Sequence, residues 1–243
     1  MSNPIVGASY FLHGLKLIFK PGIRFYVIIP LLINLVLFGL LIAFGVNYFS
    51  SWIDGLLPKL PEWLQWLSWL MWILFALATI LIVFFLFSLL TNIIGAPFNG
   101  LLAEAVEHYL TGEKPSANSG WKQFLSELGP SLKNEVKKLV YLVAWSIPLF
   151  ILFFIPLVQL VAPFIWMIFS SWMLAMEYAD YPMSNHGLKL PEVRQKLGEK
   201  RLMSLGFGGM VMLATMIPVG NFFVMPVAVA GATAYWVQQL RKR

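Results

Sequence analysis

The segment with the most distinctive chemistry is Pro21-Gly22-Ile23-Arg24, which immediately precedes a long apolar run. Proline is favoured in the first turn of a helix, and glycine lets a ligand approach the backbone. The first amides of a helix have no acceptor within the helix and lie at the positive end of its dipole. Together with Arg24, and with Lys20 as an outer partner, they predict an anion site at the membrane surface. The alternative is a simple break between two helices, with Arg24 bound to lipid phosphate.

Two pairs of ionisable residues could carry protons. Glu104 and His108 are four residues apart, so on a helix they share one face and could share a proton or a metal. The alternative is the wet face of an interfacial helix. Glu177 and Asp180 could form a paired-carboxylate site, or they could mark a helix end that returns to water.

Catalytic signals are poor elsewhere in the sequence. It contains no zinc-protease, nucleophile-elbow, phosphate-loop or dinucleotide motif. His13, His108 and His186 show no metal-ligand spacing among themselves, and the absence of cysteine excludes disulfides and thiolate metal sites. We therefore predict that the protein is not an enzyme and has neither a metal nor a cofactor.

Four runs without any charged residue define the class of protein. They cover residues 25–53, 63–103, 139–176 and 202–240, whereas a helix needs about 20 apolar residues to cross a bilayer. Only 12% of the residues are charged, about half the usual share of a soluble domain. The chain is predicted to be a multi-pass membrane protein, in which a net charge of +6 points to orientation and anionic lipid rather than to nucleic acid.

Prolines separate two kinds of apolar run. The first two runs are long enough to cross the bilayer and have a single proline each, near one end, whereas the last two are interrupted by two or more prolines and are predicted to form hairpins. We expect an all-α integral membrane protein with two long transmembrane helices, two proline-broken hairpins whose arms need not cross fully, and amphipathic interfacial helices. As one membrane domain, it comprises an interfacial helix (3–20), span 1 (22–53), span 2 (62–94), amphipathic or cytoplasmic helices (98–138), hairpin 1 (139–180), a cytoplasmic segment (181–201) and hairpin 2 (202–240).

The residue pattern predicts three details of these helices. Phe11, Leu15 and Ile18 are expected on one apolar face of the first helix, and Gly95-Ala96-Pro97 is expected to break or kink the helix of span 2. If hairpin 2 turns near residues 218–221, its first arm has 16 residues, or ~24 Å at the helical rise, which is shorter than the hydrocarbon core.

Basic residues predict the orientation. Sixteen of the 17 Lys and Arg residues lie at the two ends of the chain or in 114–138 and 189–201, and only Lys59 lies between the first two spans. By the positive-inside rule, both termini are cytoplasmic.

An anion path through such a chain would depend on backbone and neutral side chains, because the apolar runs contain no Lys or Arg. A half-helix that begins near Asn221 would aim its positive end into the bilayer, and Thr91 and Asn92 are further polar candidates for the path. The alternative is that Pro218 and Asn221 simply form the turn of a hairpin.

Several motifs in order resemble the CysZ family of bacterial sulfate transporters, over essentially the whole chain. They are His13-Gly14-Leu15, Lys20 to Arg24, Glu177 to Pro182, Asn185 to Leu188, Leu205 to Phe207-Gly208, Ile217 to Asn221 and Met225 to Thr233. The resemblance implies an inner-membrane protein that imports sulfate for cysteine biosynthesis and assembles as a homo-oligomer in contact with membrane lipid.

The resemblance also implies where sulfate binds. The Gly-hydrophobic-Arg stretch of the family's sulfate site maps onto Gly22, Ile23 and Arg24. Family members often carry a second basic residue next, where this chain has Phe25.

Moving a dianion inward against ~100 mV costs about 4.6 kcal/mol before any concentration gradient is counted. Uptake must therefore be coupled to another driving force, or the imported sulfate must be removed from the cytosol. The resemblance favours coupling to protons over removal of sulfate by cytosolic reduction. Glu104, Glu107, His108 and Glu177 are the candidate carriers.

Three other functions remain open on the sequence alone. They are a membrane scaffold with a lipid-phosphate-binding helix start, a membrane enzyme acting on lipid or phosphate compounds, and a non-selective anion channel.

Overall fold

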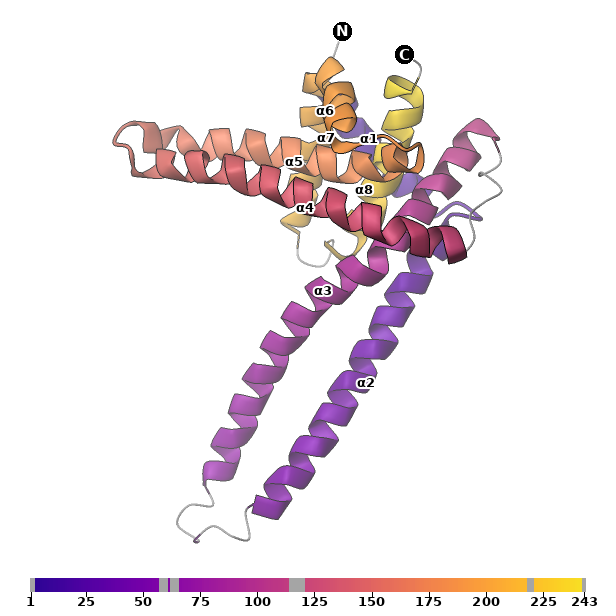
Figure 1. The fold of residues 1–243 in the computed structure, drawn as a ribbon. Helices are drawn as coiled ribbons and strands as arrows, with labels where there is room; N and C mark the ends of the chain where they lie inside the picture. The colour runs from indigo at the N-terminus through magenta and orange to yellow at the C-terminus, as the bar shows by residue number, and fades with distance from the viewer. Residues whose placement is uncertain (1–2, 57–60, 62–65, 114–120, 218–220, 242–243) are drawn as a thin grey trace. The chain divides into compact units, whose positions relative to one another are not determined.

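The structure is a computed structural model, and it describes residues 3–56, 61, 66–113, 121–217 and 221–241. Within these ranges, the side chains of residues 34, 56, 82–97, 121–135, 221 and 222 are not described. The described chain is helical between short turns (Figure 1). Its elements are α1 (Pro4–Leu17), α2 (Arg24–Leu56), α3 (Leu67–Thr111), α4 (Trp121–Ile151), η3 (Leu152–Phe154), η4 (Val158–Leu160), α5 (Ala162–Asn185), α6 (Leu190–Glu199), α7 (Arg201–Thr215), α8 (Asn221–Tyr235) and the π-helical η5 (Trp236–Leu240).

The chain forms two compact units. Unit 2 is Ile28–Phe98, and unit 1 combines Met1–Val27 with Asn99–Arg243. Helices α2 and α3 each begin in one unit and end in the other, so each unit is described separately below.

Unit 2 contains most of the antiparallel helices α2 and α3. Aromatic side chains join them, because the ring of Phe49 stacks on that of Phe75 at 4.0 Å between centroids and meets Trp72 edge-on at 5.1 Å. Apolar side chains elsewhere on α2, such as Leu35 and Phe44, are largely exposed. Such a surface on a helix of 33 residues is typical of a segment surrounded by lipid.

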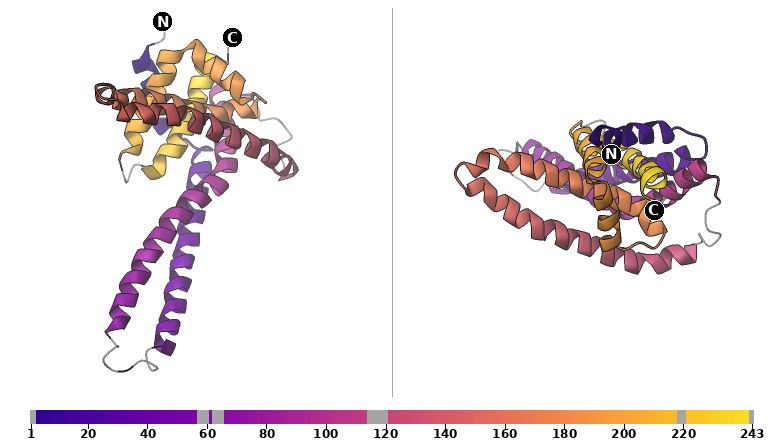
Figure 2. Two further views of the ribbon diagram at one scale, coloured as in Figure 1. Left: turned by 60° about the vertical axis from the view of Figure 1, so that its left-hand side comes forward. Right: turned by 90° about the horizontal axis from the view of Figure 1, so that it is seen from above.

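Unit 1 has a core of α1, α5, α7 and α8. Helix α1 packs on α7 and α8, and α5 packs on α7 and α8 from another side (Figure 2). The helices approach closely where glycine replaces a larger residue, since a Cβ on Gly7 would overlap the carbonyl oxygen of Met203 and a Cβ on Gly14 would overlap that of Val227. Small residues of this kind allow helix backbones to touch.

Helices α4 and α5 form a long hairpin, with η3 and η4 at its tip (Figure 2). Between Val136 and Ile151 of α4, the side chain of Lys138 is buried, whereas the other side chains are half-exposed or exposed. A few contacts near Lys138 and Tyr141 therefore anchor this part of α4.

Two helices of the described residues are long and apolar enough to cross a bilayer, judged by length and composition. They are Arg24–Gly55, which is the predicted span 1, and Val136–Phe154, which includes the first arm of hairpin 1. Within predicted span 2, the apolar helical segment among the described residues is Leu67–Leu81, which is shorter than the other two.

The expected helix break at Gly95-Ala96-Pro97 does not occur. Helix α3 runs without interruption from Leu67 to Thr111, so residues 98–111 continue span 2 instead of forming a separate helix. A proline costs a helix about 3 kcal/mol, and in apolar surroundings a full break exposes several more backbone groups that also need partners. The boundary between the two units nevertheless falls at Phe98, directly after this proline.

The boundaries of hairpin 1 also differ from the prediction. Helix α4 continues through position 138 from Trp121 to Ile151, and α5 extends to Asn185 with Pro182 inside it. The change from basic to apolar sequence therefore does not end a helix. Helix α7 ends at Thr215 after 15 residues and α8 begins at Asn221, whereas residues 218–220 of the predicted turn of hairpin 2 lie outside the described residues.

Helix α1 packs on its neighbours through a surface that differs from the predicted apolar face. Tyr10, Phe11, Gly14 and Leu17 are buried, as is Ile18 directly after the helix, whereas Leu15 is 42% exposed. Phe11, Leu15 and Ile18 were expected on one face of an interfacial helix, and of these three only Leu15 lies outside the protein-facing surface. Gly14 makes the close contact with α8.

We predict that Gly208→Ala destabilises the protein by about 1–3 kcal/mol. A Cβ on Gly208 would overlap the backbone carbonyl oxygen of Ser171 on α5, and α7 would have to move. Gly209→Ala is the matched control, because its Cβ would lie 3.5 Å from Ser171 Oγ, an ordinary contact. Thermal unfolding in detergent measures both, and equal stability of the two variants would contradict the proposed helix contact.

Candidate functional site

The predicted anion segment forms a tight turn between α1 and α2. Gly22 has φ of +88°, a backbone conformation that glycine adopts without strain, and a Cβ at this position would meet open space. The carbonyl of Lys20 accepts the backbone N–H groups of Ile23 at 3.1 Å and of Arg24 at 3.2 Å. Glycine is therefore needed for the shape of the turn as well as for access.

These hydrogen bonds change the predicted character of the site. Two of the amides that were expected to bind the anion are engaged by Lys20, and the side chain of Ile23 is buried. Arg24 is exposed at the first position of α2, with its guanidinium 5.7 Å from the centre of the Phe25 ring, and the side chain of Lys20 is also exposed. The available chemistry is thus two side-chain cations beside the positive end of a long helix.

The predicted path residues cannot be located in the same way. Thr91 and Asn92 on α3, and Asn221 at the start of α8, lie outside the residues whose side chains the structure describes.

Glu107 is the centre of a second polar cluster, which lies within unit 1. Its carboxylate is 12% exposed and lies 2.9 Å from His186 Nε2, and it accepts a hydrogen bond from Arg241 at 2.8 Å. Arg241 also donates to Glu113 at 2.6 Å, and this bond raises the pKa of the guanidinium, which keeps it charged. The cluster joins the end of α3, the turn after α5 and the end of the chain.

The two other proton candidates on α3 surround this cluster. His108 Nδ1 lies 2.6 Å from the backbone oxygen of Glu113, and Glu104 is half-buried one turn before. Of the four residues predicted to carry protons, Glu107 is the most buried, and its carboxylate lies within hydrogen-bond distance of His186.

Glu177 and Asp180 form ion pairs with one lysine. Lys138 Nζ lies 3.1 Å from Glu177 Oε2 and 3.0 Å from Asp180 Oδ2, and its side chain is 5% exposed. The two carboxylates therefore do not mark a helix end in water, since they hold α4 on α5. Among the described residues, no group of three or more acidic or histidine side chains could hold a metal ion.

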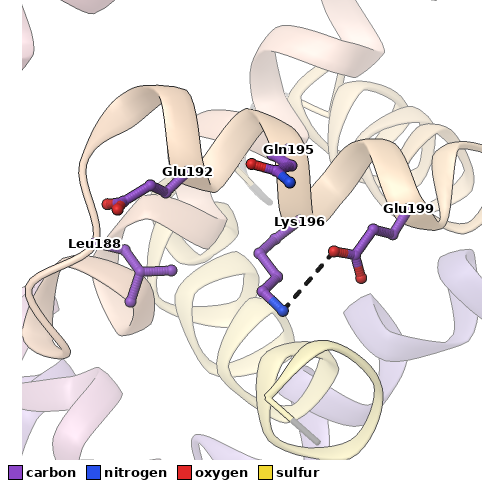
Figure 3. Close-up of a pocket in the computed structure, with 5 residues that line it drawn as sticks. All are labelled: Leu188, Glu192, Gln195, Lys196 and Glu199. Atoms are coloured by element: carbon purple, nitrogen blue, oxygen red, sulfur yellow. Dashed lines mark ion pairs between the residues drawn. The ribbon is translucent and has the colours of Figure 1, made fainter. Parts of the chain in front are cut away.

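A pocket on α6 is lined by residues that are unsuited to binding an anion (Figure 3). The Lys196 ammonium is 3.8 Å from the carboxylate of Glu199, and Glu192 accepts the backbone N–H of Lys189 at 2.6 Å. Two carboxylates and one cation give this surface a negative balance, so an anion is not expected here.

The chain is similar in sequence to known proteins over almost its whole length. The model of the family described as "Sulfate transporter CysZ/Etoposide-induced protein 2.4" matches residues 10–226. The chain belongs to the CysZ family. A protein of Pseudomonas fluorescens strain Pf-5 named "Sulfate transporter CysZ" is 49% identical over 240 residues, which cover 98% of this chain and 96% of the relative.

Two more members of the CysZ family are also named "Sulfate transporter CysZ". The one from Pseudomonas aeruginosa strain PAO1 is 44% identical over 98% of this chain and 96% of its own length. The one from Vibrio atlanticus strain LGP32 is 44% identical over 99% of this chain and 95% of its own length. The names of these relatives imply a membrane protein, in agreement with the apolar helices described above. The family match includes the segment from Lys20 to Arg24 and Glu107, whereas Arg241 lies beyond it.

His186 and Arg241 were not identified as functional candidates from the sequence. Each is far from Glu107 along the chain, by 79 and 134 residues. Their contact depends on the packing of α5 and α8 against each other, which residue spacing does not reveal. The motif Asn185 to Leu188 was the one signal that marked this turn as unusual.

We predict that Lys138→Met destabilises unit 1 by about 3 kcal/mol, because it leaves the buried carboxylate of Asp180 without its ammonium partner. Lys137→Met removes the same charge from an exposed neighbouring position and should have little effect. Thermal unfolding in detergent compares the two variants. Equal effects would mean that the ion pair does not anchor α4.

Proposed function

We propose that the protein is a multi-pass transporter of the bacterial inner membrane that takes up sulfate. The observation that carries this proposal is the match, over nearly the whole chain, to relatives named "Sulfate transporter CysZ". The long apolar helices support a membrane location, and import would supply sulfur for cysteine biosynthesis. In this proposal the protein assembles as a homo-oligomer.

The anion site of this transporter is the start of α2. Arg24 supplies a permanent charge and up to five donors, and Lys20 adds a second cation from the same turn. The positive end of α2 adds to their field. Ile23 is buried, so it fixes the turn in place instead of touching the anion, and Gly22 keeps the approach to the backbone open.

This site lies at the cytoplasmic end of α2 if both termini are cytoplasmic, as the distribution of basic residues predicts. It would then hold the anion close to the compartment into which it is released. Phe25 gives the site one charge fewer than the usual family pattern. The lower charge favours release, because a site for a transported ion must bind weakly enough to let it leave.

Coupling to protons is assigned to Glu107 and His186. Histidine is the side chain that normally changes charge near neutral pH, and here it faces the Glu107 carboxylate with Arg241 on the other side and Glu113 beyond. With His186 neutral, these four groups sum to −1, and with His186 protonated they sum to zero. A proton taken up by this cluster would therefore cancel one negative charge, which lowers the cost of bringing in an anion.

We predict that purified protein in vesicles takes up radiolabelled sulfate and that Arg24→Ala lowers the initial rate at least about tenfold, through loss of charge-assisted hydrogen bonds. Arg201→Ala is the matched control, since Arg201 is an exposed arginine at the start of another helix. Vesicles without protein give the background. Uptake no faster than this background would favour a scaffold or a missing partner over autonomous transport.

We also predict that collapsing the pH gradient at a fixed membrane potential abolishes uptake by the wild type. His186→Gln should transport slowly and without regard to the gradient, because the side chain that changes charge in the proposed coupling is absent. Glu199→Gln, on the outer face of α6, should behave like the wild type. Wild-type uptake that is unchanged without the gradient would reject coupling to protons.

A further inference from the structure

Helix α1 has two apolar faces, and the helices of unit 1 cover one of them. Gly7 and Gly14 lie on the covered face, where they contact α7 and α8. The opposite face presents Ile5 and Leu12, with Leu15 beside them, and all three are exposed, Ile5 to 76%. Ile5 and Leu12 are seven residues apart, which is close to two helical turns, so they point in the same direction. A helix whose outer side faced water would carry mainly polar residues there.

Exposed aromatic rings follow α1 in the chain. Phe19, in the turn after the helix, is 70% exposed, and Phe25 in the first turn of α2 is 56% exposed. Ile18 and Ile23 of the same turn are buried, so the turn is anchored within unit 1. The exposure of the two rings is therefore a property of a packed turn.

Basic residues accompany this apolar surface. Lys16 is exposed on α1 one turn after Leu12, and Lys20 and Arg24 are exposed in the segment that follows. Residues 1–53 contain no aspartate or glutamate, and none of the three cations forms an ion pair within the part of the chain that the structure describes. Apolar side chains next to such cations are complementary to an anionic phospholipid, in which an acyl chain adjoins a phosphate.

The place of α1 in the chain favours a lipid partner over a soluble one. Helix α2 begins at Arg24 and is long and apolar enough to cross a bilayer. The seven Cα–Cα steps from Leu17, the last residue of α1, to Arg24 cover at most about 25 Å. The end of α1 must therefore lie close to the bilayer surface at which α2 begins.

We propose that the outer face of α1, formed by Ile5, Leu12 and Leu15, is a docking surface for an anionic phospholipid. The acyl chain lies against these apolar residues, and Lys16 binds the phosphate. One cation at a membrane surface increases the affinity for anionic lipid about fivefold. The proposal rests on the membrane location of the chain and not on sulfate transport, and its tests alter no residue of the proposed anion site.

The absence of cysteine allows a single spin label to report on this face. Leu12→Cys carries the label in bilayer discs that contain phosphatidylcholine and phosphatidylglycerol, and Gln195→Cys, at an exposed position on α6, is the matched control. Oxygen concentrates in hydrocarbon, whereas a nickel chelate stays in water. The ratio of relaxation by oxygen to relaxation by the chelate should be severalfold higher at position 12 than at position 195. Ile5→Cys decides the question if Leu12→Cys does not fold.

Two results would overturn the assignment of this face to lipid. Equal ratios at positions 12 and 195 would mean that the outer face of α1 is in water. Protection of position 12 from both reagents would mean that a second copy of the chain covers the face.

The anionic character of the lipid is tested by the rise in unfolding temperature that added lipid produces in detergent. Phosphatidylglycerol should act at lower concentration than phosphatidylcholine, and Lys16→Gln should require about fivefold more phosphatidylglycerol than the wild type. Lys189→Gln removes another exposed lysine and should behave like the wild type. Equal responses to the two lipids, or an unchanged response in Lys16→Gln, would overturn the proposal. Both measurements are made without sulfate, so failure of the proposed transport would not affect them.

Discussion

Close contact between helix backbones is the constraint on which unit 1 depends. In lipid, helices gain little from hiding apolar side chains, so association relies on packing and on polar contacts between helices. Gly7 and Gly206 bring α1 and α7 together, and Gly14 and Gly231 do the same for α1 and α8. No side chain larger than hydrogen fits at these crossings without a shift of the backbone.

The polar clusters depend on this packing. His186 follows α5 and Arg241 follows α8, and both reach Glu107 at the end of α3 only when the helices of unit 1 are correctly packed. A single ion pair between exposed residues would contribute little, but a network on a buried carboxylate is costly to break. The glycine contacts and the Glu107 cluster therefore support one arrangement of the same helices.

The sequence predicted the all-helical architecture and a long apolar helix over most of residues 22–53, because long charge-free runs are local signals. It did not predict the continuity of α3 through Pro97 or of α4 through position 138. Local propensity marks the places where a helix is weakest, whereas the cost of exposing backbone in apolar surroundings decides whether it breaks.

Some features of the candidate site could likewise be predicted from the sequence, and others could not. Gly22 and Arg24 could be proposed from the sequence because the turn that contains them is local, and their role in binding an anion stays a prediction. The engagement of two amides by the Lys20 carbonyl depends on dihedral angles that residue types do not fix. The pairing of Glu177 and Asp180 with Lys138, and of Glu107 with His186, required contacts between distant segments. Buried charges need partners, so the sequence indicated that partners exist without identifying them.

Transport of a dianion imposes opposite demands on the protein, and the described residues separate them in space. Permanent cations attract sulfate but also retain it, and Arg24 and Lys20 lie exposed at the start of α2, where water screens them. In the interior of unit 1 the described charges are paired, and the unpaired groups there are the neutral N–H donors of Asn99 and Trp236. Moving the anion against ~100 mV costs about 4.6 kcal/mol, which a fixed charge cannot supply over a complete cycle. The inward movement of protons, as proposed above, can supply this energy.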